Sequence, residues 1–245
     1  TFISDINQEL ILAYSVVKED VEALIELLKQ YQHEFRSCEN IEKNEAYYFS
    51  KRMDYRNSLE NFDFGQYNSD WIERAAHLIF LNKTCFNGLF RVNKKGLFNV
   101  PFSKVANQTI CDENNLRKVS KIIKNTTIIR GDFTDSRNFI DKNTFVYFDP
   151  PYRPINKTSH FTDYSKFTFN DDEQKRLAFY FTELDSRNAK LMLSNSDPKN
   201  HDSNDDFFDE LYSEFNIKRV DAKRSINSKG QGRGKIKEIL VTNYE

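Results

Sequence analysis

Asp149, Pro150, Pro151 and Tyr152 are four consecutive residues that suit chemistry on an amino group, and they directly follow an apolar run at 144–148. Such a run is typical of a buried parallel strand, and open α/β sheets bind their ligands at the carboxyl edge of the strands. Two prolines fix backbone angles and remove two N–H donors. We therefore expect a stiff turn, rich in hydrogen-bond acceptors, at a ligand-binding edge.

The acceptors of this turn would activate an exocyclic amino group such as that of adenine, a poor nucleophile because its lone pair is delocalised into the ring. Asp149 can accept one amino hydrogen and the Pro150 carbonyl the other, and both bonds favour the charge that develops as the nitrogen attacks. Tyr152 offers a ring on which a base taken out of a duplex can stack, which recovers ~1–3 kcal/mol of lost stacking. The alternative interpretation is an ordinary turn after a buried strand.

The elements that must position this turn follow an alternating strand and helix pattern. The apolar runs that predict strands of the core are 2–4, 126–130, 144–148 and 190–194. The segments that predict helices beside them are 6–17, 21–31 and 171–184. The runs 216–221 and 236–243 are joined by a basic, glycine-bearing link, which indicates an antiparallel pair at a sheet edge.

Between about 36 and 116 the alternation stops, and the chain becomes polar and aromatic. One helix is predicted there, from Ser69 or Asp70 as N-cap to Leu81. The simplest organisation is an α/β core formed by 1–35 and 117–245, interrupted by an inserted, mostly helical domain at 36–116.

Charge and composition narrow the classes of function. The formal net charge is −1, yet residues 83–104 carry five basic and no acidic residues, and 218–237 carry eight basic residues against one acid. Two concentrated positive segments on an otherwise acidic chain fit a phosphate-binding face, although two solvated loops remain the alternative. No apolar run approaches the ~20 residues that cross a bilayer.

The 3 cysteines form no Cys-x-x-Cys pair, and the 4 histidines show no ligand spacing, so we expect neither a disulfide framework nor a metal. A reducing cytoplasm is the expected location. The glycines at 230, 232 and 234 precede a strand rather than a helix, so they are a doubtful nucleotide loop.

Residues 144–152 resemble the catalytic motif of amino-group DNA methyltransferases, and the chain as a whole resembles the Dam-type adenine methyltransferases of the alpha group. The other blocks that carry this resemblance, in the family's order, are 82–93 with 98–102, 131–133, 193–196, and 224–228 with 233–235. The closing stretch, 233–245, is most similar to the methylase of the Dpn restriction system. The resemblance implies a Rossmann-like methyltransferase sheet with an inserted DNA-recognition domain, in a bacterial or phage-encoded protein associated with the nucleoid through DNA.

The resemblance also implies S-adenosylmethionine as methyl donor and assigns its contacts. Asp5 follows a strand and opens a helix, where a carboxylate can bind both ribose hydroxyls; helix N-capping is its alternative role. Phe133 would flank the cofactor adenine, or else be a core residue after a strand end. Asp132 and Asp149 complete the expected cofactor contacts.

The segment at 82–102 would read double-stranded DNA, and the family implies a GATC target. Asn87 and Gly88 mark a tight turn, and Phe86 is placed to wedge beside a flipped base, with a core aromatic as its alternative. Arg91 could bond to guanine O6 and N7, and Leu89 could touch a thymine methyl. The remaining DNA contacts we expect, mainly to phosphate, are Lys94, Lys95, Arg224, Lys229 and Arg233.

The family's Lys- and Gly-bearing opening segment and its Pro-Phe-x-Gly-Gly-Gly loop are absent from these residues. We expect the chain to be a fragment that alone binds S-adenosylmethionine weakly. The leading hypothesis is an adenine-N6 methyltransferase that acts on duplex DNA as a monomer. The rival hypotheses are a cytosine-N4 methyltransferase and a DNA-binding protein without catalysis.

Overall fold

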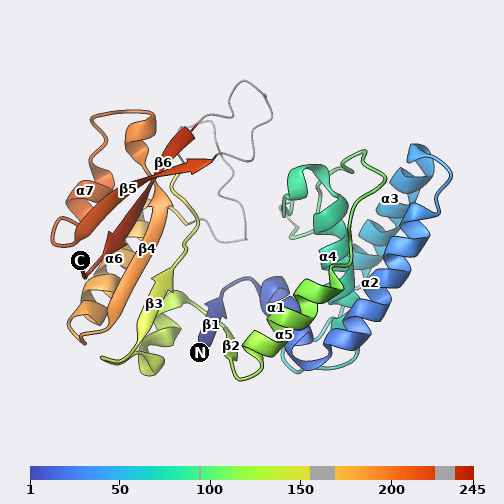
Figure 1. The fold of residues 1–245 in the computed structure, drawn as a ribbon, viewed down its shortest axis with the longest axis horizontal. Coiled ribbons are helices and arrows are strands. Elements are labelled where there is room, and N and C mark those ends of the chain that lie inside the picture. The colour runs from blue at the N-terminus through green and yellow to red at the C-terminus, as the bar shows by residue number, and fades with distance from the viewer. Residues whose placement is uncertain (94, 155–168, 224–234) are drawn as a thin grey trace. The chain divides into compact units, whose positions relative to one another are not determined.

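The computed structural model describes residues 1–93, 95–154, 169–223 and 235–245. The chain folds into two compact units, Thr1–Phe133 and Thr134–Glu245 (Figure 1). Within the described residues, none of the helices combines the length and the apolar composition that crossing a membrane requires.

In the first unit, a two-stranded parallel sheet carries a set of helices. Strand β1 (Phe2–Asp5) pairs with β2 (Thr127–Arg130) so that Asp5 lies opposite Arg130. The helices between them are α1 (Gln8–Glu19), α2 (Val21–Arg36), α3 (Ile41–Asn57), α4 (Asp70–Thr84), the 3-10 helix η1 (Phe86–Gly88) and α5 (Glu113–Ile123). The predicted helices at 6–17 and 21–31 are confirmed, with α2 extending to Arg36.

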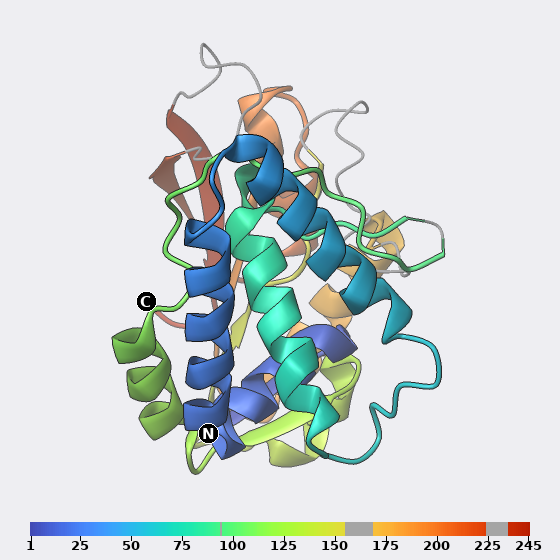
Figure 2. The same ribbon diagram turned by 90° about the vertical axis from the view of Figure 1, so that its right-hand side faces the viewer.

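The core of this unit is aromatic. Helices α2 and α4 lie side by side (Figure 2), and α2 buries the apolar face that its sequence period predicts. Phe35 of α2 meets Phe80 of α4 edge to face, with ring centroids 5.7 Å apart. Arg74 of α4 donates from Nε to Glu9 Oε2 of α1 at 2.9 Å, and both residues are buried. This ion pair joins α1 to α4.

Helix α3 was not predicted, because its sequence lacks an apolar period. It buries only Asn44, Tyr48 and Tyr55. Its function in the fold is to supply donors: the Tyr48 hydroxyl donates to the Val100 carbonyl at 2.8 Å, and Arg56 Nε donates to the Phe98 carbonyl at 2.7 Å. Hydrogen bonds from α3 side chains therefore hold the segment around 98–100.

The second unit contains a four-stranded mixed sheet in the order β3-β4-β6-β5. The strands are β3 (Phe145–Phe148), β4 (Lys190–Ser196), β5 (Asn216–Lys223) and β6 (Lys235–Thr242). β3 is parallel to β4, and β6 runs antiparallel to both β4 and β5. The predicted parallel strands at 144–148 and 190–194 are confirmed, as is the antiparallel pair at the sheet edge.

Helix α6 (Asp171–Asp185) packs against this sheet (Figure 1). It begins at Asn170, whose side chain accepts hydrogen bonds from the backbone N–H groups of Asp172 and Glu173, a standard N-cap arrangement. The short elements η2 (Phe133–Phe139), η3 (Pro198–Asn200) and α7 (Phe207–Leu211) complete the described part of the chain. The chain thus has an α/β fold, as predicted.

Candidate active site

The predicted motif begins where β3 ends. Phe148 is buried, whereas Asp149 directly after it is exposed at the carboxyl edge of the sheet. Because Phe148 is paired with Leu193 on β4, Asp149 lies beside Ser194. The Ser194 hydroxyl is 3.3 Å from Asp149 Oδ1, to which it donates, and 2.9 Å from the Tyr147 hydroxyl. Ser194 lay in a family-like block of the sequence, but no role was predicted for it.

Three side chains from α6 and β4 hold the backbone of the turn. Gln174 Nε2 donates to the Pro151 carbonyl at 3.0 Å. Asn195 Oδ1 accepts from the Arg153 N–H at 2.9 Å, and the Ser196 hydroxyl donates to the Arg153 carbonyl at 2.6 Å. Tyr152 is therefore flanked on both sides by anchored backbone groups.

Arg153 fixes the far end of the turn. Its guanidinium donates from Nε to Asp171 at 2.8 Å and from Nη1 to Asp205 at 2.7 Å, and it lies 4.3 Å from the centroid of the Phe207 ring. The hydrogen bond with Asp171 is the main reason that the pKa of Arg153 is raised. The residue immediately after the motif is thus a fixed cation that anchors the turn.

Tyr152 is half-buried, which leaves part of its surface exposed. Burial raises the pKa of its phenol, and the charges of Glu238 and Asp149 act in the same direction, while a hydrogen bond with Ser194 opposes them. The phenol accordingly stays protonated at neutral pH, so that Tyr152 adds no further charge beside Asp149.

Asp5 lies at the carboxyl end of β1 and is half-buried. Its Oδ1 accepts from the Asn7 N–H at 2.6 Å. Burial raises the pKa of Asp5, and this bond to Asn7 partly offsets the effect. The residue that caps α1 is Asn7, which accepts from the Glu9 N–H at 3.0 Å, so the N-cap role considered for Asp5 is wrong.

Asp132 and Phe133 follow β2 and are half-buried. The parallel pairing brings their segment to the same edge as Asp5, because the Gly131 N–H donates to the Asp5 carbonyl at 3.1 Å. Three of the four predicted cofactor residues thus follow paired strands of the first unit. Asp149, the fourth, belongs to the second unit.

The predicted recognition segment forms an arm whose two sides meet at the isolated bridges Cys85–Phe102 and Val92–Phe98. At its first turn, Asn87 and Gly88 have φ angles of 57° and 62°, a left-handed backbone that suits these residues. The tight turn is confirmed. Phe86 is 44% exposed, so the alternative of a core aromatic is wrong, whereas Leu89 is half-buried.

Arg91 is exposed, but Asn99 holds it across the arm. Arg91 Nε donates to Asn99 Oδ1 at 2.8 Å and Nη2 to the Asn99 carbonyl at 3.3 Å. The Nη1 edge of the guanidinium is left for a ligand within the described structure. Asn99 was not predicted, since an asparagine carries no signal of this role. Lys95 is exposed, and Lys94, Arg224, Lys229 and Arg233 lie outside the described residues.

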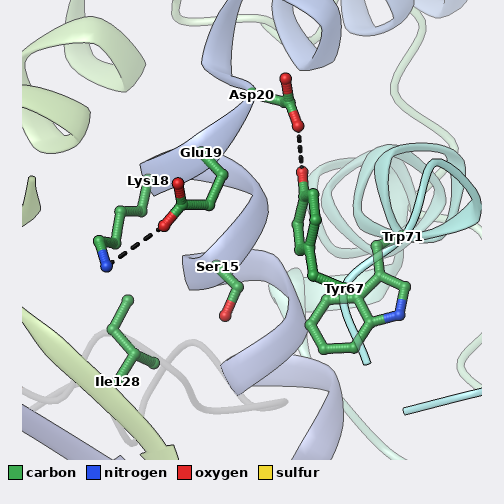
Figure 3. Close-up of a pocket in the computed structure, with 7 residues that line it drawn as sticks. All are labelled: Ser15, Lys18, Glu19, Asp20, Tyr67, Trp71 and Ile128. Carbon is green, nitrogen blue, oxygen red and sulfur yellow. Dashed lines mark hydrogen bonds and ion pairs between the residues drawn. The ribbon is translucent and has the colours of Figure 1, made fainter. Parts of the chain in front are cut away.

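A surface hollow of about 590 Å³ lies in the first unit, between the end of α1 and β2 (Figure 3). Four of its polar side chains pair with one another: the Tyr67 hydroxyl donates to Asp20 Oδ2 at 2.6 Å, and Lys18 lies 3.2 Å from Glu19. The hollow contains none of the predicted site residues. Across the residues with described positions, no group of three His, Cys, Asp or Glu side chains could hold a metal ion.

Comparison with known proteins finds DNA methyltransferases in each case. The family described as D12 class N6 adenine-specific DNA methyltransferase matches residues 1–226. The chain is 51% identical over 243 residues to the type II methyltransferase M.MjaIII of Methanocaldococcus jannaschii, covering 99% of this chain and 79% of that protein. It is 38% identical to the type II methyltransferase M1.LlaDCHI of Lactococcus lactis, over 99% and 78% of the two chains. A DNA adenine methylase of Haemophilus influenzae is 31% identical, over 98% and 76%.

Proposed function

Because the chain belongs to the D12 class of N6 adenine-specific DNA methyltransferases, we propose that Asp149, Pro150, Pro151 and Tyr152 form its catalytic centre. The observation that carries this proposal is the turn after β3. Three groups follow one another there, at the carboxyl edge of parallel strands: a carboxylate, the Pro150 carbonyl and a half-buried aromatic ring. The Pro150 carbonyl accepts no hydrogen bond from the described residues.

Asp149 accepts one hydrogen of the adenine amino group, and the Pro150 carbonyl accepts the other. These two bonds orient the nitrogen and stabilise the positive charge that develops on it as it attacks. Ser194 donates to Asp149 and so orients the carboxylate. Tyr152 stacks on the adenine once the base has left the duplex, and returns part of the stacking energy that flipping costs.

S-Adenosylmethionine, the donor that this family implies, supplies an electrophilic methyl group when it is bound. Asp5 fits the sugar of that cofactor: it is a half-buried carboxylate at a strand end, and one of its oxygens accepts no hydrogen bond from the described residues, so a ribose hydroxyl can donate to it. We assign Phe133 to the cofactor adenine, and Asp132 and Asp149 to further contacts with the cofactor.

The target that we propose is adenine in GATC, which the enzyme reads as a monomer on duplex DNA. Phe86 is exposed beside the tight turn and can wedge next to the flipped base. The Nη1 edge of Arg91, which no described residue bonds, suits guanine O6 and N7, and Leu89 suits a thymine methyl. The lysines of the arm and the 224–233 link would bind phosphates.

We further propose that 1–35 and 117–245 form a Rossmann-like catalytic domain of the alpha group, with 36–116 as the inserted recognition domain and a Dpn-like closing stretch. The parallel pairs β1–β2 and β3–β4 support such a sheet. The compact unit Thr1–Phe133 includes parts of both proposed domains, and within it the buried pair of Glu9 and Arg74 joins α1 to α4.

The test is methyl transfer from labelled S-adenosylmethionine by the protein expressed from its own gene. Substrates are a duplex with one GATC site and duplexes with each base pair of that site replaced in turn. Asp149→Ala should abolish transfer, whereas Asp172→Ala, a change at an exposed carboxylate on α6, should not. Digestion to nucleosides identifies the product. Equal rates on all the duplexes would refute the GATC target, and an active Asp149→Ala variant would refute the catalytic centre.

A further inference from the structure

We propose that Gln174 is a positioning residue for methyl transfer: it engages the Pro151 carbonyl, so that the neighbouring Pro150 carbonyl is the acceptor left for the substrate amine. This inference rests on the catalytic centre proposed above. The residue lies on α6, outside every motif that the sequence analysis singled out.

The turn cannot fix its own carbonyls. Pro150 and Pro151 carry no N–H, so this part of the chain lacks the donors with which a turn usually satisfies itself. Two consecutive carbonyls, of Pro150 and Pro151, could then compete for the same amino hydrogen. A donor from outside the turn must decide between them, and among the described residues the side chain of Gln174 is the one that reaches Pro151.

The Gln174 amide is fully buried, and its hydrogen bonds offset the free-energy cost of burying it. Its side chain is 0% exposed, and burying an amide is unfavourable unless its donors and acceptor are bonded. Its Nε2 donates to the Pro151 carbonyl at 3.0 Å, and its Oε1 accepts from Asn195 Nδ2 at 3.2 Å. Asn195 is also 0% exposed and accepts from the Arg153 N–H at 2.9 Å. The two amides therefore form one buried chain that binds the turn on both sides of Tyr152.

Helix α6 holds the first amide of this chain rigidly. Gln174 is in the first turn of the helix and shares a buried face with Leu177, Ala178 and Phe181. The same helical turn contains Asp171, which accepts from Arg153 Nε at 2.8 Å. Helix and catalytic turn are thus linked at two points, one neutral and one charged.

The first test replaces Gln174 by Met, which keeps the approximate size of the side chain and removes the donor. The single-turnover rate of methylation should fall by about 100-fold, the effect expected when reacting groups are misplaced by about an ångström. The dissociation constant for GATC duplex should change by less than about threefold, because this buried residue lies outside the segment that we assign to DNA reading. The fluorescence of 2-aminopurine in place of the target adenine reports base flipping separately.

The second test, Gln174→Glu, measures the pH dependence of the methylation rate, which a purely structural role of Gln174 would not change. A protonated carboxyl can donate to the Pro151 carbonyl and accept from Asn195, as the amide does, whereas an ionised carboxylate has no donor for Pro151. The rate of Gln174→Glu relative to wild type should therefore rise as the pH is lowered, by up to about tenfold per pH unit. Gln30→Glu makes the same chemical change on an exposed face of α2 and should show no such trend.

Leu184→Ala controls for loss of stability, since Leu184 is buried in the same helix but lies about 15 Å further along its axis than Gln174. All variants are assayed well below their measured unfolding temperatures. The proposal is overturned if Gln174→Met keeps its rate within about twofold of wild type, if Gln174→Glu shows no pH trend, or if Leu184→Ala is slowed as much as Gln174→Met. An active Asp149→Ala variant would instead remove the catalytic centre on which the proposal rests.

Discussion

Replacing Asn99 by Ala should weaken the reading of one base pair of the target while leaving the rest of the enzyme unchanged. Asn99 bonds twice to the Arg91 guanidinium, through its Oδ1 at 2.8 Å and its carbonyl at 3.3 Å. Its backbone N–H also donates to the Arg91 carbonyl at 3.0 Å, a bond that Ala retains. The substitution therefore removes the Oδ1 bond to the Arg91 side chain, and it keeps both the carbonyl bond to Nη2 and the backbone bond between the two sides of the arm.

The expected magnitude follows from the exposure of the pair. Arg91→Ala removes a whole bidentate contact, worth about 1–3 kcal/mol of discrimination, or about 5- to 150-fold. Asn99→Ala removes only one restraint on the Arg91 side chain. The lost side-chain hydrogen bond is exposed, so it contributes at the low end of about 0.5–1.5 kcal/mol. The less restrained Arg91 side chain must also give up part of its ~2 kcal/mol of rotamer entropy when it binds. A loss of about 1 kcal/mol, or about fivefold in kcat/KM on GATC, is expected.

The assay compares kcat/KM on GATC and on duplexes with one base pair replaced, for wild type, Arg91→Ala, Asn99→Ala and the double variant. If Asn99 acts through Arg91, the double variant should be no worse than Arg91→Ala, because the restraint has nothing left to hold. Discrimination should relax at one base pair alone. Fully additive losses would show that Asn99 contacts DNA independently, and would refute the reasoning.

Three other predictions concern residues of both units. Arg74→Met should lower the free energy of unfolding by about 3–5 kcal/mol in denaturant titrations, because it leaves Glu9 buried without its partner. Adding Glu9→Leu to the same chain should recover much of this loss. A double variant whose loss equals the sum of the two single losses would contradict the prediction. Burial lowers the pKa of His77 from 6.5 to about 4, so the unfolded chain binds a proton in this interval that the folded chain does not. Stability should therefore fall by about 1.4 kcal/mol per pH unit as the pH drops from 6.5 to 4, and an equally steep fall in His77→Gln would exclude His77 as the cause. Tyr152→Ala should slow methylation and weaken the flipped state by about 1–3 kcal/mol, whereas Tyr152→Phe should keep most of the stacking energy. An equal loss of methylation rate in both variants would show that the hydroxyl, not the ring, is needed.

Local patterns predicted most of the strands and helices, because burial imposes a period on them. Helix α2 follows its apolar spacing closely, and β3 and β4 follow their apolar runs. Helix α3 could not be found in this way. Its buried positions are few, and its stability depends on hydrogen bonds such as that of Tyr48 to the Val100 carbonyl, across 52 residues of sequence.

In the candidate site, too, the local features could be predicted from the sequence and the long-range contacts could not. The turn at 149–152 could be predicted because its chemistry and its position after a strand are both local. Its supports could not, since Ser194 and Gln174 come from a different strand and helix and meet the turn only in the folded sheet. For Arg91, a contact with guanine is predicted from the sequence, whereas its partner Asn99 could not be.

The partners that the sequence did not reveal include three amides, and the chemistry of the amide group explains why. Each amide holds a neutral donor and a neutral acceptor together, so Gln174 can bond a carbonyl and Asn195 at the same time with no buried charge to compensate. A carboxylate in its place would face the Pro151 carbonyl without a donor, and a lysine would have no acceptor for Asn195 and would carry a charge into a fully buried position. Acids, bases and nucleophiles can be recognised in a sequence as candidate reactive groups, because those residues change charge during a reaction. The neutral amides that hold the turn in place, Gln174 and Asn195, carry no such signal in the sequence.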